Sequence, residues 1–380
     1  MSARTGFAVS FPKHGRLIGC AMALALMLSA FVLAPGVANA QEPTTTTYLA
    51  LGDSISFGYT EERFNNHFPT ESPSYFQEGF TNDFAKDLAK PSEVGKSIRL
   101  VNDACPGETS NGLIGEDPSL FGHVSEETYA EIEQKPEEDL ELWYGGYQGL
   151  KDYHPCKYTF QSHLPLHNGG YVSEGTEVSQ LEEALATIAS GAKIEAITLN
   201  IGSNDELAGI TQCKDEVFYE FATKGKSKYP GPAELAVLGC IKESSEHILV
   251  PHIIENIGHT IAVLDGSGYT GPIVLLGFYN PDALILPGSD ALQKGTNEAV
   301  KSEILPSFPN VALANPFPIF NKGSTPAKEQ KSICEYTEMC NSNDPGGSHD
   351  DGDIHPTVKG YKELGKLVNS AYLQLVAKGV

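Results

Sequence analysis

Five short apolar segments are spread along the chain, and the stretches between them repeat apolar residues at helical spacing. The five segments are residues 48–51, 98–102, 196–201, 273–278 and 311–314. Their apolarity is continuous instead of alternating, which is typical of strands buried on both faces. Strands that alternate with helices form a parallel sheet covered on both sides, so the pattern predicts an α/β fold with a doubly wound sheet.

Helical spacing of apolar residues predicts four helices between and after these strands. The spaced residues are Tyr75, Phe76, Phe80, Phe84 and Leu88, then Leu181, Leu185 and Ile188, then Ile253, Ile254, Ile257, Ile261 and Leu264, and lastly Leu364, Leu367 and Val368 in a closing helix from about Thr357. Ligands of such folds bind beyond the carboxyl ends of the strands. Residues that directly follow a strand are therefore the first candidates for a site.

The first forty residues have the pattern of a secretory signal peptide. Basic residues precede an apolar run at 17–33, and Ala38-Asn39-Ala40 places small residues where a signal peptidase cleaves. We expect a mature chain that starts at Gln41 and is secreted to the extracellular space. The alternative is a retained anchor, because the run falls only a little short of the roughly 20 residues that span a bilayer.

The charge of the chain is strongly negative. The sequence holds 26 Lys and Arg against 49 Asp and Glu, a net charge of −23. Such a surface repels phosphate backbones and anionic membranes. We therefore expect no nucleic acid partner, and membrane contact only through a substrate.

Six of the seven cysteines follow the predicted cleavage site, which predicts disulfides in an exported chain. Sequence proximity favours the pairs Cys105–Cys156, Cys213–Cys240 and Cys334–Cys340, although six cysteines allow 15 pairings. The alternative is a metal site, but the cysteine spacings suit no zinc motif.

The mature chain, residues 41–380, is expected to form one domain with two insertions. The first, at about 111–175, is rich in glycine, proline, tyrosine and acidic residues around Trp143. It is either a lid or substrate platform over a pocket, or a solvated helix and loop held by a disulfide. The second insertion, at about 206–245, holds Cys213 and Cys240.

Ser54 follows the first predicted strand in the turn Gly52-Asp53-Ser54. A serine hydroxyl attacks a carbonyl only when a neighbouring base removes its proton. The chain offers His355, which precedes Pro356 and the closing helix, and histidine takes and returns protons near neutral pH. Each motif taken alone is more typical of a turn; the two together predict a nucleophile and its base.

Attack on an ester creates an oxyanion that requires hydrogen-bond donors. Two further strand ends supply candidates: Asn204 in Gly202-Ser203-Asn204-Asp205, and the backbone N–H of Gly107. By themselves both segments are also ordinary loops of turn-forming residues.

These four segments in this order resemble the blocks of the SGNH/GDSL hydrolase family, from near the mature N-terminus to the last helix. The resemblance implies a flavodoxin-like three-layer α/β/α sandwich, with Ser54 as nucleophile and His355 as base. It further implies an oxyanion hole made by the N–H groups of Ser54 and Gly107 and the side chain of Asn204. Asp53 and Asp205 would then support their loops.

The third member of the triad departs from this family's pattern. The family carries Asp three residues before the histidine, where this chain has Gly352. Asp353 lies two residues before His355 and Asp351 four before. We favour Asp353 as the residue that orients His355, with Asp351 or a backbone carbonyl as alternatives.

The resulting hypothesis is a secreted esterase or lipase that forms an acyl-enzyme on Ser54. It requires no metal or organic cofactor and acts as a monomer on a small-molecule or lipid ester. Its rivals are a non-catalytic secreted binding protein on the same fold, and an enzyme for phospholipid or acetylated-polysaccharide esters. The natural ester and its acyl-chain length stay open at this point.

Overall fold

The five predicted apolar segments form one parallel sheet. The computed structural model describes residues 44–67, 73–90, 96–115, 179–284, 289–323, 325–341 and 352–380. The strands are β1 (Thr44–Gly52), β2 (Lys96–Asn102), β3 (Ile194–Asn200), β4 (Ile273–Leu276) and β5 (Val311–Ala314). They lie in the order β2-β1-β3-β4-β5, all parallel, which is the order of flavodoxin-like doubly wound sheets. The predicted α/β fold class is confirmed.

Helices fill the segments between the strands. The described helices are α1 (Ser54–Phe57), α2 (Glu61–His67), η1 (Pro73–Phe76), α3 (Phe80–Leu88), α4 (Ser110–Ile114), α7 (Gln180–Ala189), α8 (Ser203–Lys224), α9 (Ala233–Ser244), η4 (Ser245–Leu249), α10 (Val250–Gly266), η5 (Pro281–Leu284), α11 (Asp290–Ala299), η6 (Val300–Ile304), α12 (Phe317–Phe320), α13 (Pro326–Tyr336), η7 (Glu338–Cys340) and α14 (Val358–Ala377).

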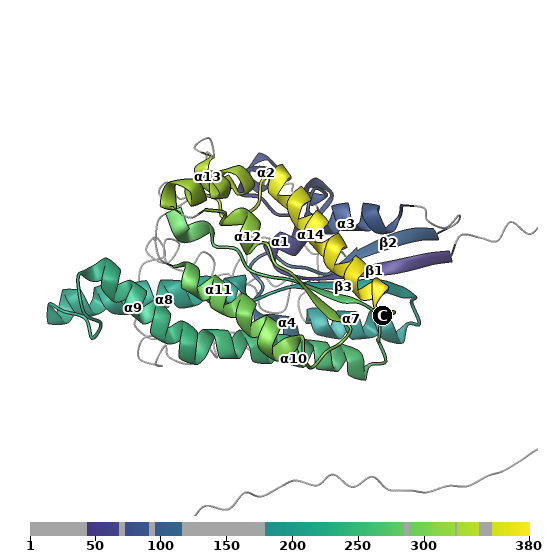
Figure 1. Ribbon diagram of the computed structural model, residues 1–380, viewed down its shortest axis with the longest axis horizontal. Coiled ribbons are helices and arrows are strands. Elements are labelled where there is room, and N and C mark those ends of the chain that lie inside the picture. The colour runs from purple at the N-terminus through teal and green to yellow at the C-terminus, as the bar shows by residue number, and fades with distance from the viewer. Residues whose placement is uncertain are drawn as a thin grey trace, which may run out of the picture. The chain divides into compact units, whose positions relative to one another are not determined.

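Each face of the sheet packs against its own helices (Figure 1). Successive strand residues point to opposite faces, so Leu49 and Leu51 pack with α7 and α10, whereas Tyr48 and Ala50 pack with α3 and α14. Both clusters consist of buried apolar side chains. The burial of the sheet on both faces explains why its strands read as continuous apolar runs.

The register places the strand ends at one edge of the sheet. Ala50 pairs with Asn102, Gly52 with Asn200, and Leu276 with Ala314. The segments that follow β1, β2 and β3 therefore start side by side, which is where the candidate residues lie.

The predicted helix over Tyr75 to Leu88 is divided in the structure. Tyr75 and Phe76 belong to the 3₁₀ helix η1, and Gly79 precedes α3 as its N-cap in an extended conformation. The extended residue interrupts the helical hydrogen bonding. The apolar spacing nevertheless continues across this interruption, so the sequence pattern did not reveal that two helices are present.

The second insertion is helical. α8 and α9 lie side by side (Figure 1) and are joined by the disulfide Cys213–Cys240. Ile210, Val217 and Ile241 belong to a small core that these helices share. The predicted disulfide Cys334–Cys340 is present as well.

Several predictions fall on residues outside the described ranges. Cys105 is disulfide-bonded, but its predicted partner Cys156 lies outside them. So do residues 1–40, residues 116–175 of the first insertion, and Asp351. The signal peptide, the domain limits and the role of the acidic insertion therefore stay predictions. In the part of the chain that the structure describes, no helix is long and apolar enough to cross a membrane.

Candidate active site

The chain turns sharply where β1 ends, and this turn presents Ser54. Gly52 has a φ of +140°, and a Cβ atom added there would lie 2.1 Å from the backbone oxygen of Asn200 in β3. Glycine is therefore the residue that this position requires. Asp53 caps α1, because its Oδ1 accepts a hydrogen bond of 2.9 Å from the Ile55 N–H. Ser54 begins that helix and is buried.

His355 reaches the serine hydroxyl from the other end of the chain. The distance between His355 Nε2 and Ser54 Oγ is 2.8 Å. The imidazole meets the ring of Tyr59 edge to face at 4.7 Å between centroids, and the Tyr361 hydroxyl donates to the Tyr59 carbonyl at 2.6 Å. Since Tyr361 lies on α14, the last helix fixes both the histidine segment and the ring that packs on it.

Asp353 completes a continuous hydrogen-bonded chain. Its Oδ1 lies 2.5 Å from His355 Nδ1 and also accepts from the His355 backbone N–H at 3.0 Å. Its Oδ2 accepts from the Glu61 N–H at 2.9 Å. Burial raises the pKa of Asp353, but the charge of His355 and these hydrogen bonds outweigh burial and hold the pKa below its usual value. Asp353 is therefore an ionised partner for an imidazolium.

The geometry of Gly352 explains the departure from the family spacing. Gly352 has a φ of +69°, and a Cβ atom there would lie 2.3 Å from the Met339 backbone oxygen. A side chain does not fit between this loop and η7. The segment is held in place because the Glu338 N–H donates to the His355 carbonyl at 2.9 Å. Position 352 therefore has no room for an acidic side chain, whereas Asp353 hydrogen-bonds to His355.

Gly107 and Asn204 lie on the segments that follow β2 and β3. The Cys105 N–H donates to the Gly52 carbonyl at 2.9 Å, which ties the first of these segments to the serine turn. Asn204 Nδ2 donates to the Glu108 carbonyl at 2.8 Å. Gly107 adopts a φ of +82° in the intervening turn. The structure thus brings Asn204 and the Gly107 turn together at the edge of the sheet that carries Ser54.

Asp205 fixes the start of α4. Its Oδ2 accepts from the Ser110 N–H at 2.9 Å, and its Oδ1 accepts from the Ser110 hydroxyl at 2.5 Å. Asn256 of α10 donates to the same hydroxyl at 2.9 Å. Ser110 and Asn256 were missed by sequence reasoning. Their signal, single polar residues beside apolar helix faces, is too common to have pointed to the site.

Gln180 and Glu108 were missed as well, and they lie behind the serine turn. Gln180 donates to the Gly52 carbonyl at 2.9 Å and accepts from the Gly52 N–H at 2.8 Å. It also donates to Glu108 at 3.1 Å. Burial raises the pKa of Glu108 to about 8 and that of Asp53 to about 7, although hydrogen bonds lower both. The pKa values of Glu108 and Asp53 are therefore raised, whereas the pKa of Asp353 is lowered.

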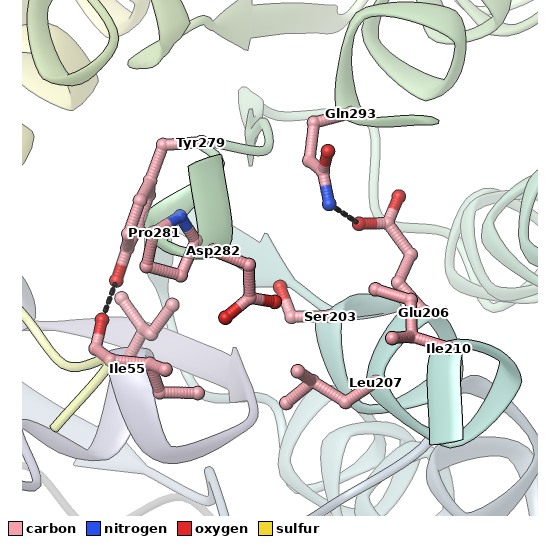
Figure 2. A pocket seen from close by; sticks show the side chains of 10 residues that line it. Ile55, Ser203, Glu206, Leu207, Ile210, Tyr279, Pro281, Asp282 and Gln293 are labelled. Atoms are coloured by element: carbon pink, nitrogen blue, oxygen red, sulfur yellow. Dashed lines mark hydrogen bonds between the residues drawn. The ribbon is translucent and has the colours of Figure 1, made fainter. Parts of the chain in front are cut away.

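A cavity of about 40 Å³ lies among residues of α1, α8, η5 and α11 and the residue before His355 (Figure 2). It is lined by Ile55, Ser203 and Ile354, which are the chain neighbours of Ser54, Asn204 and His355. Its other lining residues are Glu206, Leu207, Ile210, Tyr279, Pro281, Asp282 and Gln293. The Tyr279 hydroxyl, whose hydrogen bond is dashed in Figure 2, donates to the Ile354 carbonyl at 2.9 Å. The wall is thus mixed, with apolar side chains and a few polar groups.

Within the described ranges, no group of three or more histidine, cysteine or acidic side chains is placed to hold a metal ion. The expectation that the protein needs no cofactor stays a prediction.

Comparisons with known proteins find similarity only among solved structures. No family model and no curated protein sequence matches the chain. The chain resembles a lipase from a goat rumen metagenome, with 15% identity, a TM-score of 0.40, and coverage of 86% of this chain and 97% of that one. It also resembles a G-D-S-L family lipolytic protein from Veillonella parvula, with 12% identity, a TM-score of 0.37, and coverage of 87% and 99%.

A third similar structure is a carbohydrate esterase family 2 enzyme from Corynascus thermopiles. The identity is 14% and the TM-score is 0.40, with coverage of 90% of this chain and 69% of that one. None of the three structures is similar enough to decide what this chain does. Its function is inferred from the geometry of its own site.

Proposed function

We propose that the protein is a secreted serine hydrolase that cleaves carboxylic esters. The supporting observation is the hydrogen-bonded chain from Ser54 Oγ through His355 to Asp353, with links of 2.8 Å and 2.5 Å. All three side chains are buried. This arrangement serves proton transfer from a hydroxyl to an imidazole whose charge a carboxylate stabilises.

In the first step Ser54 Oγ attacks the ester carbonyl carbon while His355 Nε2 takes the hydroxyl proton. Asp353 keeps the proton of His355 on Nδ1, which leaves Nε2 free to act as the base. The carbonyl oxygen becomes an oxyanion as the new bond forms. His355 then gives its proton to the leaving alcohol, and an acyl group stays on Ser54.

The oxyanion requires donors that are in place before the reaction. Ser54 is the first residue of α1, and the first N–H groups of a helix lack intrahelical partners. The Gly107 N–H and the second N–H of the Asn204 amide complete the proposed set. Asn204 uses its other N–H to hold the Gly107 turn, so one side chain would both position a donor and supply one.

In the second step a water molecule attacks the acyl group, with His355 as base, and the acid is released. We further propose that the protein acts as a monomer outside the cell and without a cofactor. The disulfides Cys213–Cys240 and Cys334–Cys340 support an oxidising compartment.

Replacement of the nucleophile tests the proposal. We expect Ser54→Ala to lower hydrolysis of p-nitrophenyl acetate by a factor of about 10³ or more. Ser56→Ala is the matched control, because Ser56 lies in the same short helix and its hydroxyl only donates to the Leu51 carbonyl. Both variants are checked for thermal unfolding. Undiminished hydrolysis by folded Ser54→Ala would refute the mechanism.

Replacement of Asn204 tests the oxyanion hole separately. We expect Asn204→Ala to lower kcat by roughly 10²–10³. A smaller loss, with Ser54 still essential, would remove Asn204 from the hole and leave the hydrolase.

The rival proposal is a non-catalytic binding protein on the same fold. An aligned serine, imidazole and carboxylate gives no advantage to binding alone, which favours the hydrolase. Covalent labelling by a fluorophosphonate separates the two, because only an activated serine reacts at an appreciable rate.

A further inference from the structure

One wall of the cavity that Ile55, the neighbour of Ser54 in the chain, helps to line is polar. Glu206 and Gln293 lie next to each other there, and Gln293 Nε2 donates to Glu206 at 3.0 Å (Figure 2). The Thr296 hydroxyl also approaches Glu206, at 2.7 Å. Glu206 and Gln293 are each only 3% exposed. These side chains come from α8 and α11, which do not carry the reactive groups Ser54 and His355.

Gln293 has an unsatisfied polar atom. Its Oε1 is buried and has no hydrogen-bond partner among the described residues. A buried acceptor without a partner costs about 1–3 kcal/mol, so most such atoms in folded proteins find a donor. Gln293 lines the cavity, and a small rotation of its amide would bring the unsatisfied atom to a ligand there, which would supply the donor.

The alternative orientation of the amide leads to the same conclusion. Burial raises the pKa of Glu206 to about 8, although Thr296 and Gln293 lower it by hydrogen bonding, so the carboxyl group is largely protonated at neutral pH. A protonated Glu206 is able to donate to Gln293 if the amide turns over. The unsatisfied atom is then Nε2, a donor. A hydroxyl group satisfies either orientation, since it both donates and accepts.

We propose that this cavity binds a hydroxyl-bearing part of the ester substrate and that Gln293 recognises the hydroxyl. This inference rests on the proposed function, because it treats the cavity as part of an ester-cleaving site. The size fits a small group: a cavity of about 40 Å³ holds a few non-hydrogen atoms, given that one water molecule needs about 10–15 Å³.

The charges around the cavity exclude anionic groups. Asp282 lines it beside Ser203, and its charge contributes to raising the pKa of Glu206 after the larger effect of burial (Figure 2). A carboxylate or phosphate in this space would meet Asp282 and would raise the cost of ionising Glu206 further. The substrate class is therefore an uncharged ester with a hydroxyl near the reacting carbonyl. That hydroxyl comes either from the leaving alcohol, as in a polyol ester, or from the acyl group, as in a hydroxy acid ester.

Three esters distinguish these sources. Ethyl propionate is the reference, ethylene glycol monopropionate adds a hydroxyl to the alcohol, and ethyl lactate adds one to the acyl group. Values of kcat/KM are measured by release of acid and divided by the rate of alkaline hydrolysis of each ester, which removes intrinsic reactivity. We expect one of the two hydroxylated esters to be preferred about tenfold or more.

Gln293→Leu keeps the approximate volume of the side chain and removes its polar atoms. We expect this variant to lose at least three quarters of the preference, because the amide that recognises the hydroxyl is then gone. Thr296→Val is the matched control: it removes the other partner of Glu206, but Thr296 does not line the cavity. We expect Thr296→Val to retain the preference. Thermal unfolding of each variant verifies that it is folded.

The possible outcomes distinguish failure of hydroxyl recognition by Gln293 from failure of the proposed hydrolase function. A protein that reacts with fluorophosphonate at Ser54 but shows equal corrected kcat/KM values, or cleaves none of the three esters, overturns the inference and leaves the hydrolase. A preference that Gln293→Leu retains also overturns it. Absence of labelling at Ser54 refutes the proposed function, and the inference with it.

Discussion

The serine turn, residues 52–58, and the histidine turn, residues 352–357, reach the same point by different means. The serine turn is bound to the sheet, because the Asp53 N–H donates to the Asn200 carbonyl and Gln180 hydrogen-bonds to both the N–H and the carbonyl of Gly52. Among the described residues, the backbone–backbone hydrogen bonds that tie the histidine turn to preceding segments join it to Tyr336 and Glu338, and neither residue lies in a strand. This turn is held by the η7 segment, which the disulfide Cys334–Cys340 closes. The serine turn is therefore held by the central sheet, whereas the histidine turn is held by a short disulfide-closed segment.

The two turns each carry an aspartate, and the pKa values of these groups shift in opposite directions. Asp53 is fully buried, its Oδ2 has no hydrogen-bond partner among the described residues, and burial raises its pKa to about 7. Burial also raises the pKa of Asp353, but the charge of His355 and three hydrogen bonds together lower it by more, so the net shift is downward. Of these two aspartates, Asp353 is the one that hydrogen-bonds to the imidazole and has a lowered pKa. The carboxyl group next to Ser54 in sequence thus has a capping role, and the distant one has the electrostatic role.

The largest expected effect comes from exchanging these carboxyl groups for amides. We expect Asp353→Asn to lower kcat for p-nitrophenyl acetate by about 10³–10⁴, because an amide does not hold the required tautomer or stabilise the imidazolium. Asp53→Asn retains the oxygen that caps α1 and serves as the control, with a loss below about tenfold. Equal losses in the two variants would show that the turns do not differ as described.

A smaller but still large effect is expected at Gly52. Alanine there places a Cβ atom 2.1 Å from the Asn200 carbonyl, and the sheet prevents either backbone from moving away. We expect Gly52→Ala to lower the free energy of unfolding by about 3 kcal/mol or more, measured by urea denaturation. A loss below about 1 kcal/mol would mean that the serine turn is not fixed by the sheet.

Gly352→Ala makes the same kind of change in the histidine turn. The added Cβ atom would lie 2.3 Å from the Met339 carbonyl, but Gly352 is exposed and lies outside the sheet, so we expect the local backbone to shift and to displace Asp353. We expect about a hundredfold loss of kcat/KM with only about 1 kcal/mol of lost stability. If stability falls as much as in Gly52→Ala, the contrast between the turns is wrong.

The last expected effect concerns the pH dependence of stability. Since the pKa of Asp53 is raised from 3.8 to about 7, the folded protein holds this proton more tightly than the unfolded chain does. The associated stability is fully present below about pH 4 and is lost as the pH rises towards 7. Because a rise in pKa of this size corresponds to about 4 kcal/mol, wild type should lose on the order of 4 kcal/mol more than Asp53→Asn between pH 4 and pH 8 in urea denaturation. Parallel pH profiles of the two proteins would contradict this.

The sheet and the order of the site segments could be predicted because burial on both faces leaves a direct trace in the sequence. Continuous apolar runs located β1 to β5, and residues that follow such runs in a parallel sheet meet at one edge. Ser54, Asn204 and Gly107 were found in this way. The extra residues of β1, Thr44 to Thr47, were missed because their polar hydroxyl groups hide a run of β-branched residues.

The choice among the acids near His355 depended on packing that the sequence does not display. Nothing in the order of residues 351–355 reveals that η7 leaves no room for a side chain at position 352. The polar wall of Glu206 and Gln293 was missed for a similar reason, since α8 and α11 are far apart in sequence and meet only in the folded chain. Contacts between distant segments were therefore what sequence reasoning could not supply.

The most direct test of the account is the rate at which a fluorophosphonate labels Ser54, with the modified residue located by mass spectrometry. We expect wild type to be labelled at Ser54, Ser54→Ala not at all, and His355→Ala about 10³-fold more slowly or less, because the serine then lacks its base. Labelling of Ser54 at the same rate in wild type and His355→Ala, or no labelling of folded wild type, would contradict the claim that His355 activates Ser54.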